Sequence, residues 1–530
     1  MGIPSFYKHL IQTIGGLTSK TRSPPKVFAL DLNCAIYHCV RKVQRRFPFN
    51  PEVQPKWEKD LVDTVIAYIK DINAIVNPSK TLYIGVDGVA PMAKIKQQRM
   101  RRFKSAIQAE EEARIKAEAK GHVYVELPRW DTNAITPGTQ FMEKLTVALR
   151  DYAKTSPKII VSPADEPGEG EQKIMAWVRA QKSDDVVVYG LDADLIVLSL
   201  WAHATMGIRM DLFREETEFN GMIKEDALGE TQYLYLNIQQ LAVALHSKYG
   251  GGKTKSAFLV DFVGLMNILG NDFVCHGLGL KIKDDGVEKL LGIQGTEPLV
   301  FGPTEHKEDG VWRYNTTALK HIFKTLAPQE PAWILKNIRK KLEARVGSTA
   351  SKNPEDQALA RFNDLPVEWA ADRVMIESAG DDKPQLKKGW RQIYDKEALL
   401  GPTAPQVYLQ SLAWTLAYYS GQPVDMEWYY PWFLPPRMES ILEVLETQDT
   451  LDVPNTVRPV LKPLEQLAMV LPKSSFNLLP AEYRRLDTQY PHAWPVSWKT
   501  YSFGRRFLWE CEPLIPLVQA DQIRAWIAKS

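Results

Sequence analysis

The 530-residue sequence predicts an α/β fold, in which a mostly parallel sheet flanked by helices is followed by a second, helical region rich in aromatic residues. Two observations lead to this prediction. In the first half of the chain, short apolar runs alternate with segments of helical periodicity, which is the pattern of β/α units with parallel strands. From about residue 364 the composition changes to helices rich in Trp and Tyr, and residues 414–436 are the densest part.

Six runs have the length and composition of buried strands: 26–33, 81–88, 158–162, 186–190, 208–213 and 232–238. The fourth, VVVYG, is β-branched without alternation, as expected for a strand covered on both faces. The segments predicted as helices are 35–46, 57–76, 91–120, 171–181, 255–270 and 316–345.

A polar stretch rich in Gly, Ser and Pro, at 347–357, indicates a boundary between two parts of the chain. No internal repeat and no low-complexity tract is present. We therefore expect a first domain at 1–345, a linker at 346–363, the aromatic-rich helical region at 364–480, and a C-terminal tail at 481–530 that packs on the core.

Composition excludes several classes of protein. The formal net charge is only +2, so any binding of nucleic acid must come from local positive patches. No apolar run has the length of a membrane-spanning helix, and we expect no membrane partner. The cysteines lack CxxC or zinc-site spacing and are expected to be free thiols of a reducing compartment. They are Cys34, Cys39, Cys275 and Cys511.

Acidic residues follow several predicted strands and open the helices beside them. Within 165–194, one pair follows a Pro-Gly turn at the start of a helix, and a second pair follows the fourth strand. Ligands of open α/β sheets bind at the carboxyl ends of the strands, so we expect these acids to converge. The full set is Asp31, Asp87, Glu169, Glu171, Asp192, Asp194 and Asp272.

Each acid also has an ordinary structural explanation. One pair can be the acidic first turn of a helix, and the other pair can form an Asx turn. Taken alone, Asp31, Asp87 or Asp272 can be a cap or turn residue. The whole set is poorly explained in this way, because like charges in one crevice repel unless cations neutralise them. Oxygen ligands without His or Cys favour Mg²⁺, with Mn²⁺ as a substitute, over Zn²⁺. Two such ions would activate a water and stabilise the leaving oxygen of a phosphodiester.

A basic helix is predicted directly after Asp87. The eleven residues from Lys94 to Lys104 contain six cations and no acid. Helical spacing places Lys94, Gln98, Arg101 and Arg102 on one face, where donors without acceptor partners suit a terminal phosphate. The alternative is a solvated basic face, the usual role of a charge run. Its position beside the acids favours phosphate binding.

Aromatic side chains provide a third candidate element. Tyr37 or His38, on the helix after Asp31, and Trp428 in the second region are predicted to stack on the bases of a single strand. Trp414 lies in an apolar helical context that is typical of core packing, whereas Trp428 follows a Gly-Gln-Pro loop. Trp428 is therefore the better stacking candidate.

Together these residues resemble the Xrn family of 5′→3′ exoribonucleases. The resemblance covers 1–280 densely and 388–436 more loosely. The motifs that carry it are MGIPSFYKHL at the start, LDLN with Asp31, GVDGVAPMAKIKQQRMRRF, PGEGEQKIM, YGLDADLI, LLGNDF and YYPWFLPP.

The resemblance implies a PIN/flap-nuclease-like first domain and processive hydrolysis of single-stranded RNA from a 5′-monophosphate end to mononucleotides. It implies that the seven acids hold two Mg²⁺ ions and that Lys94, Gln98, Arg101 and Arg102 bind the 5′-phosphate. The family's base-stacking histidine falls at Tyr37 here, with His38 next to it, and the other stacking wall falls at Trp428.

Two other functions are compatible with parts of this sequence. Flap-type DNA 5′ nucleases share the acidic set and the initial Met-Gly, but the QQR.RRF helix and the sequence after Asp272 favour the Xrn family. A degenerate nuclease that only binds RNA would not need all seven acids. The preference for RNA over DNA is left open, because contacts to the 2′-OH have no sequence motif.

Further expectations concern the setting of the protein. We expect a monomer in the cytoplasm, with the nucleus as the alternative, and the sequence identifies no protein partner. Both cellular branches of the family usually carry long C-terminal extensions. Because this sequence stops soon after the second matching block, we expect a minimal catalytic form of viral or protist origin.

Overall fold

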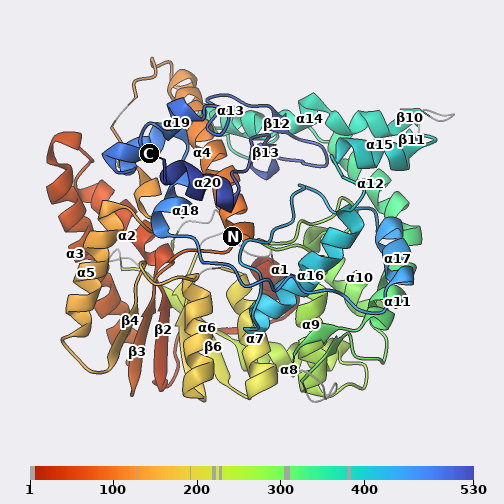
Figure 1. Cartoon of the computed structure of the whole chain (residues 1–530), viewed down its shortest axis with the longest axis horizontal. Helices are drawn as coiled ribbons and strands as arrows, with labels where there is room; N and C mark the ends of the chain where they lie inside the picture. Colours follow the sequence, from red (N-terminus) through yellow and green to blue (C-terminus); the bar gives the residue numbers. More distant parts are fainter. Residues whose placement is uncertain are drawn as a thin grey trace.

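A seven-stranded sheet is the centre of the N-terminal half of the protein (Figure 1). The computed structural model describes residues 6–126, 128–190, 192–217, 223–225, 230–303, 311–378 and 384–529. The strands are β1 (Thr18–Ser19), β2 (Val27–Asp31), β3 (Thr81–Gly85), β4 (Ile159–Ser162), β5 (Asp185–Tyr189), β6 (Arg209–Glu215) and β7 (Tyr233–Asn237). Their order is β1-β7-β6-β5-β2-β3-β4, with β2 to β6 parallel and β1 and β7 antiparallel to their neighbours. The predicted mostly parallel sheet is confirmed.

Helices cover both faces of this sheet, because both faces of its strands are apolar. On β5, Val187 and Tyr189 pack into the core formed with α2, α3 and α5, while Val186 and Val188 pack into the core formed with α6 to α9. The helices of this half are α1 (Phe6–Thr13), α2 (Asn33–Arg46), α3 (Gln54–Val76), α4 (Met92–Ala119), α5 (Gln140–Ala153), α6 (Gly170–Gln181), α7 (Asp194–Met206), α8 (Ile238–Tyr249), α9 (Lys255–Ile268) and α10 (Gly286–Ile293).

The C-terminal half is mainly helical, as predicted. Its helices are α11 (Thr316–Leu326), α12 (Glu330–Leu342), α13 (Pro354–Asn363), α14 (Leu365–Trp369), α15 (Trp390–Glu397), α16 (Ala404–Ser420), α17 (Met438–Thr447), α18 (Pro463–Val470), α19 (Leu486–Gln489) and α20 (Ala520–Ile527). Three short antiparallel pairs accompany them: β8 (Val300–Phe301) with β9 (Arg313–Tyr314), β10 (Ile376–Ser378) with β11 (Pro384–Leu386), and β12 (Thr500–Tyr501) with β13 (Glu512–Pro513). Helix α16 is almost wholly buried and packs on α9, which joins the two halves.

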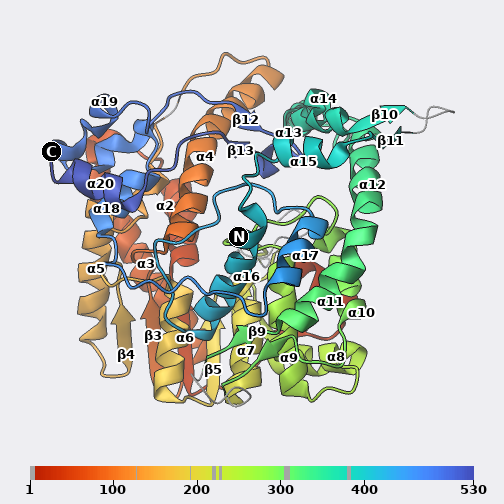
Figure 2. The ribbon, with the colours of Figure 1, turned by 45° about the vertical axis from the view of Figure 1, so that its right-hand side comes forward.

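Helix α4 leaves the sheet and is surrounded by the end of the chain, as both ribbon views show (Figures 1 and 2). It packs against α13, α18 and β13. The buried guanidinium of Arg99 donates to the backbone carbonyls of Met469, Ala493 and Pro516, which come from three separate segments. The C-terminal residues therefore complete the environment of α4.

Two predicted segments differ from the structure. The expected linker at 346–363 is irregular only in its first part, because α13 begins at Pro354 and packs on α4. Asn353 caps that helix and Pro354 occupies its first turn, a start signal that the preceding Gly and Ser residues obscured. The helix expected at 316–345 is divided into α11 and α12 by a short turn at Ala327–Gln329, which contains a proline.

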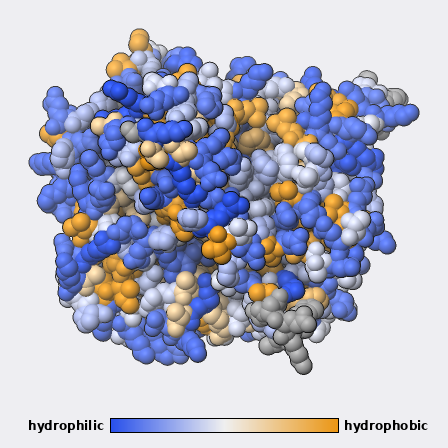
Figure 3. Space-filling view, viewed as in Figure 1, coloured by the Kyte–Doolittle hydropathy of each residue, from blue (hydrophilic) through white to orange (hydrophobic). Residues whose placement is uncertain are grey.

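The outer surface gives no sign of a membrane segment. Among the described residues, no helix combines the length and the apolar character needed to cross a bilayer. The face seen in Figure 3 is largely hydrophilic, with hydrophobic side chains scattered over it.

Candidate active site

Acidic residues at the ends of five elements meet at the carboxyl ends of β2, β3 and β5. Asp31 ends β2, and Asp87 lies two residues beyond β3. Gly170, the first residue of α6, lies against both: its N–H donates to Asp87 Oδ1 at 2.7 Å, and a Cβ there would lie 2.6 Å from Asp31 Oδ1. A side chain at this position would push α6 away, so the glycine allows Glu169 and Glu171 to reach the same edge.

Three further acids, Asp192, Asp194 and Asp272, complete the cluster. Asp194 is the first residue of α7 and is buried, and Asp272 follows α9. The pKa of Asp194 is shifted by both Asp272 and Asp192, so the three carboxyl groups lie close to one another. The structure thus brings the seven predicted acids together at one edge of the sheet.

Lys94 lies among these acids. Its Nζ is 2.6 Å from Asp272 Oδ2 and 2.9 Å from Glu169 Oε2, and the side chain is mostly buried. Gln97 Nε2 donates to the other oxygen of Asp272 at 2.8 Å. The sequence predicts that Lys94 binds a 5′-phosphate. In the structure its ammonium contacts two carboxylates of the cluster instead. The spacing of residues along one helix does not indicate such a contact, because it says nothing about the neighbours of that helix.

Burial and crowding shift the pKa values of the acids. Burial, reinforced by Asp87, raises the pKa of Asp31 well above its usual value. Burial also raises the pKa of Glu171 well above its usual value, even though Lys94 opposes the shift, and the pKa of Asp194 to about 8. For Asp272 burial acts in the same direction, but the nearby positive groups, with Lys94 first among them, together outweigh it and lower the pKa. One ammonium therefore does not neutralise the whole cluster.

The donor atoms suit a hard divalent ion. Asp31 Oδ1, Glu171 Oε1 and Asp194 Oδ1 are buried oxygens without a hydrogen-bond partner. Carboxylate oxygens are the ligands that Mg²⁺ and Mn²⁺ prefer. As the side chains lie, no group of three His, Cys, Asp or Glu residues within the described ranges is arranged to hold an ion. The chemistry of the cluster fits the predicted metal ions, while its present geometry is organised around Lys94.

The other residues of the predicted phosphate site remain together on α4. Arg102 is buried and donates to Thr136 Oγ1 at 2.6 Å, and burial lowers its pKa to about 10. Gln98, one turn earlier, is buried with its Oε1 unpartnered. Arg101 and Tyr37 both lie near enough to shift the pKa of Arg102. This part of the predicted donor face therefore adjoins the predicted stacking residue.

The structure separates the two neighbouring candidates for base stacking. Tyr37 is 37% exposed, whereas His38 is 6% exposed. The His38 ring packs 5.0 Å from the ring of Tyr68, and burial lowers its pKa to about 4. Successive residues of α2 point in different directions, and His38 points into the core. His38 has no free face for a base, so we retain Tyr37.

Trp428 is the outer member of an aromatic column that ends at the acids. It stacks on Trp414 at 5.7 Å, and Trp414 stacks on Tyr418 at 4.9 Å. The hydroxyl of Tyr418 donates to Glu169 Oε1 at 2.8 Å. Trp414 is fully buried, as its apolar context predicted, and Trp428 is partly buried.

Sequence reasoning missed several residues of this site. Asn33 donates to Asp87 Oδ2 at 2.8 Å and accepts from the Asp87 backbone N–H, so it fixes that carboxylate. Its place two residues after Asp31, at the end of a strand, is a signal that could have identified it. Thr136 and Tyr418 had no such signal, because their partners lie 34 and 249 residues away in the chain.

Comparison with known proteins finds two family models that match the chain. The family model described as XRN 5′-3′ exonuclease N-terminus matches residues 1–216, and the model described as Xrn1 helical domain matches residues 370–529. The first match contains six of the acids and α4, and the second contains Trp428. Asp272 lies between the two matches.

Curated relatives are similar along nearly the whole chain. Human 5′-3′ exoribonuclease 1 is 27% identical over 99% of this chain and 34% of its own length. The 5′-3′ exoribonuclease 2 of Arabidopsis thaliana is 26% identical over 99% of this chain and 66% of its own. The 5′-3′ exoribonuclease 1 of Schizosaccharomyces pombe is 26% identical over 99% of this chain and 48% of its own length. The chain thus spans from about one third to about two thirds of the length of these relatives.

Proposed function

Because the chain belongs to the Xrn family of 5′-3′ exonucleases, we propose that it hydrolyses single-stranded RNA from a 5′-monophosphate end, releasing one nucleotide at a time. The observation that carries this proposal is the acidic cluster at the sheet edge, with the donors of α4 directly beside it. A nuclease needs both: carboxylates at the bond that breaks, and cations at the end of the strand that is recognised.

The acids are proposed to hold two Mg²⁺ ions. Bound there, the ions would supply a water activated for attack and stabilisation of the leaving oxygen. The protein's own part is to fix the carboxylates: Asn33 and the Gly170 N–H hold Asp87, and Tyr418 holds Glu169. Lys94 keeps positive charge in the middle of the cluster.

The proposed 5′-phosphate site consists of Gln98, Arg101 and Arg102, with Lys94 at its edge toward the acids. Thr136 holds the buried Arg102 in place. A buried guanidinium favours the binding of an anion such as a phosphate. Tyr37 adjoins Arg102 and is exposed enough to stack on the first base. These few donors match the charge of one phosphate group, so we expect a monophosphate to be preferred over a triphosphate.

A time course on 5′-end variants tests the function. Single-stranded RNA and DNA carrying 5′-monophosphate, triphosphate or hydroxyl ends are incubated with Mg²⁺. We expect mononucleotides, with the monophosphate RNA degraded fastest and the triphosphate nearly excluded. The hydroxyl leaves the buried cations unpaired, and the triphosphate brings more bulk and negative charge than the proposed donors match. Equal rates on all ends, or an intact oligonucleotide released from a flap, would contradict the proposal.

Trp428 gives a prediction about binding. We expect Trp428→Ala to weaken the binding of short single-stranded RNA by roughly 1–3 kcal/mol, the usual value for loss of one base-stacking contact. Fluorescence anisotropy in EDTA measures the affinity, and a thermal melt shows whether the fold is kept. Trp369→Ala, which removes an exposed tryptophan elsewhere, is the matched control. A large fall in melting temperature with unchanged RNA affinity would mean that Trp428 is only a packing residue.

Tyr418 gives a prediction about the reaction step. We expect Tyr418→Phe to lower the single-turnover cleavage rate by about tenfold, because a hydrogen bond to a charged group contributes about 1.5–3 kcal/mol. The ring and its stacking on Trp414 are kept, so RNA affinity should not change. Tyr408→Phe is the control, because Tyr408 is also buried on α16 and makes no hydrogen bond to the acids within the described part of the chain. A loss of RNA affinity without a change in rate would assign Tyr418 to substrate binding instead.

A further inference from the structure

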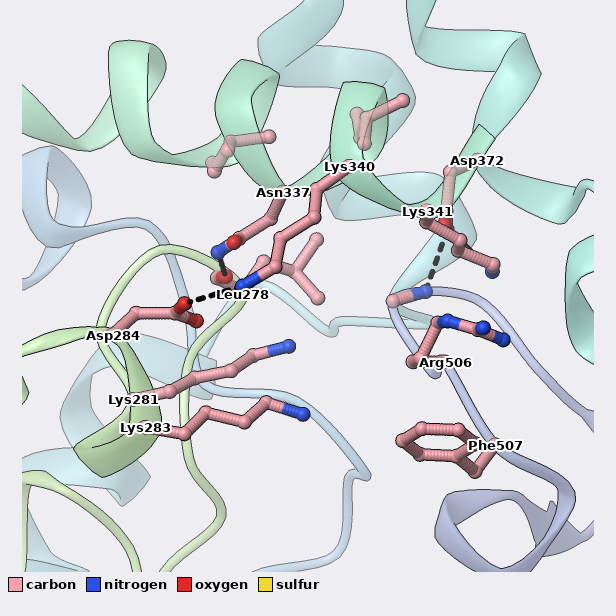
Figure 4. Close-up of a pocket in the computed structure, with 13 residues that line it drawn as sticks. Leu278, Lys281, Lys283, Asp284, Asn337, Lys340, Lys341, Asp372, Arg506 and Phe507 are labelled. Carbon is pink, nitrogen blue, oxygen red and sulfur yellow. Dashed lines mark hydrogen bonds and ion pairs between the residues drawn. The ribbon is translucent and has the colours of Figure 1, made fainter. Parts of the chain in front are cut away.

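Two neighbouring cavities lie beyond the acidic cluster, and the larger of them runs along α4. The larger, of about 810 Å³, begins at Asp272 and passes Arg101 and Lys104. The smaller, of about 260 Å³, lies beneath α12 and is shown in Figure 4. They share three lining residues, Lys281, Lys283 and Phe507. The larger cavity lies within the range of about 300–1,000 Å³ that is typical of small-molecule sites.

The walls of these cavities are positively charged. Several of their cations have protein partners: Lys340 pairs with Asp284 at 3.3 Å, Lys341 pairs with Asp372 at 2.7 Å, and Lys283 pairs with Glu510 at 3.3 Å. Lys281, at the junction, has neither a hydrogen-bond nor an ion-pair partner for its ammonium among the described residues, and the same holds for the guanidinium of Arg101. In Figure 4 the side chains of Lys281 and Lys283 extend side by side into the same space.

An unpaired ammonium in a partly closed cavity indicates an anionic ligand. Burial, with Lys283 nearby, lowers the pKa of Lys281 to about 8. Desolvation of a cation is unfavourable unless a negative group compensates it. A phosphate placed between Lys281 and Lys283 would supply that charge.

Aromatic rings stand next to these lysines. Phe507 and Trp509 are stacked at 5.7 Å with 10° between their planes, and both line the larger cavity. Lys283 Nζ lies 5.9 Å from the centre of the Phe507 ring. Trp509 is 59% exposed, so its ring is open to a ligand in the cavity. A flat aromatic surface beside two neighbouring lysines suits a nucleobase together with its phosphate.

We propose that the larger cavity is the exit path of the released nucleoside 5′-monophosphate, which binds there with its phosphate at Lys281 and Lys283 and its base on Phe507 and Trp509. The inference rests on the proposed function. Arg101, which is proposed to hold the 5′-phosphate before cleavage, also lines the cavity, so the phosphate can pass from Arg101 to Lys281.

The incoming strand is assigned a different route. Tyr37 and Trp428, the two exposed or partly exposed stacking candidates, line neither cavity. On α4, Gln98 and Arg102 are one turn apart on one side of the helix. The cavity is lined by the adjacent side of the helix, which carries Gln97, Arg101 and Lys104. The cavity therefore begins at the acids but leads away from the proposed path of the strand.

Calorimetric titration with adenosine 5′-monophosphate in EDTA tests the proposal without requiring hydrolysis. We expect the double variant Lys281→Ala/Lys283→Ala to bind it about tenfold more weakly, as expected when charge-assisted contacts are lost. Trp509→Ala should also weaken binding. Lys387→Ala/Lys388→Ala removes the same charge from an adjacent lysine pair outside both cavities and should bind as the wild type does. Unchanged affinity in the first variant, or inorganic phosphate binding as tightly as the nucleotide, overturns the assignment.

Kinetic measurements distinguish a role of the cavity in product release from a role in binding the incoming RNA strand. We expect adenosine 5′-monophosphate to inhibit the Lys281→Ala/Lys283→Ala variant about tenfold less strongly than the wild type, with the single-turnover rate of the first cleavage unchanged. A fall in RNA affinity and in first cleavage together would place the strand, and not the product, in the cavity, and would overturn the proposal. If the wild type released no mononucleotide, the proposed function would fail, whereas the titration would still report on nucleotide binding in the cavity.

Discussion

Replacement of Asp194 by asparagine is expected to abolish RNA hydrolysis while the protein still binds single-stranded RNA. The side chain is buried among the acids, and its Oδ1 has no hydrogen-bond partner, so it is available as a metal ligand. Bound metal ions contribute several kcal/mol to the stabilisation of a phosphodiester transition state, and we expect the rate to fall about a thousandfold or more. Single-turnover cleavage in Mg²⁺ and RNA binding in EDTA measure the two properties.

The control is Asp165→Asn, which removes a carboxylate from the loop between β4 and α6. Asp165 is exposed and pairs with Arg150 at the surface, outside the cluster. The Asp165→Asn variant should cleave RNA at nearly the wild-type rate. Substantial Mg²⁺-dependent activity in Asp194→Asn would rule out a metal-binding role for this residue.

The same substitution should stabilise the protein in metal-free buffer, and the gain should depend on pH. Burial, with Asp272 nearby, raises the pKa of Asp194 to about 8. In the unfolded chain its pKa is about 3.9, so between these values the folded state holds a proton that the unfolded state has lost. The stability of the wild type therefore falls as the pH rises from about 4 to about 8. Asparagine does not titrate, so the melting temperature of the variant minus that of the wild type should rise across this window and level off above it.

The second large effect concerns stability. Replacement of Arg99 by methionine is expected to lower the free energy of unfolding by about 3 kcal/mol or more, because buried carbonyls that lose their donor each cost about 1–3 kcal/mol. Arg99 is fully buried, and its donors reach three segments of the C-terminal region. Urea unfolding followed by tryptophan fluorescence measures the change, and hydrogen exchange of residues 469–516 shows where protection is lost.

Arg114→Met is the control on the same helix. Arg114 is half-exposed and pairs with Glu111 and Glu118 at the surface, where such pairs contribute little. Its loss should change the free energy of unfolding by less than about 1 kcal/mol. Equal effects of the two substitutions would show that the tail does not depend on Arg99.

The parallel sheet and the acidic cluster could be predicted from sequence because both depend on local signals. Apolar strands that end in aspartate place their side chains at one edge whatever the rest of the chain does. The donor face of α4 was predicted from helical spacing alone, and spacing does not show which neighbours each cation meets. Lys94 turns to Asp272 and Glu169, and Arg99 turns to the C-terminal region.

Other features required contacts between distant parts of the chain. Helical periodicity did not resolve which of Tyr37 and His38 faces solvent, because that depends on how α2 packs on α3. The bond between Tyr418 and Glu169 joins residues on different helices of different halves. The product cavity is formed by α4, the segment after Asp272 and the C-terminal residues, none of which carries a nucleotide-binding motif of its own.

The attachment of Arg99 also determines when the protein can become complete during its synthesis. The carbonyls that satisfy this guanidinium lie 370, 394 and 417 residues further along the chain. At a ribosomal rate of about 5–20 residues per second, α4 waits on the order of 20–80 seconds before its buried cation is paired. A nascent chain that has not reached Pro516 already carries all seven acids but only an unfinished α4. We therefore expect such a chain to leave RNA near the ribosome intact until the C-terminal residues have emerged.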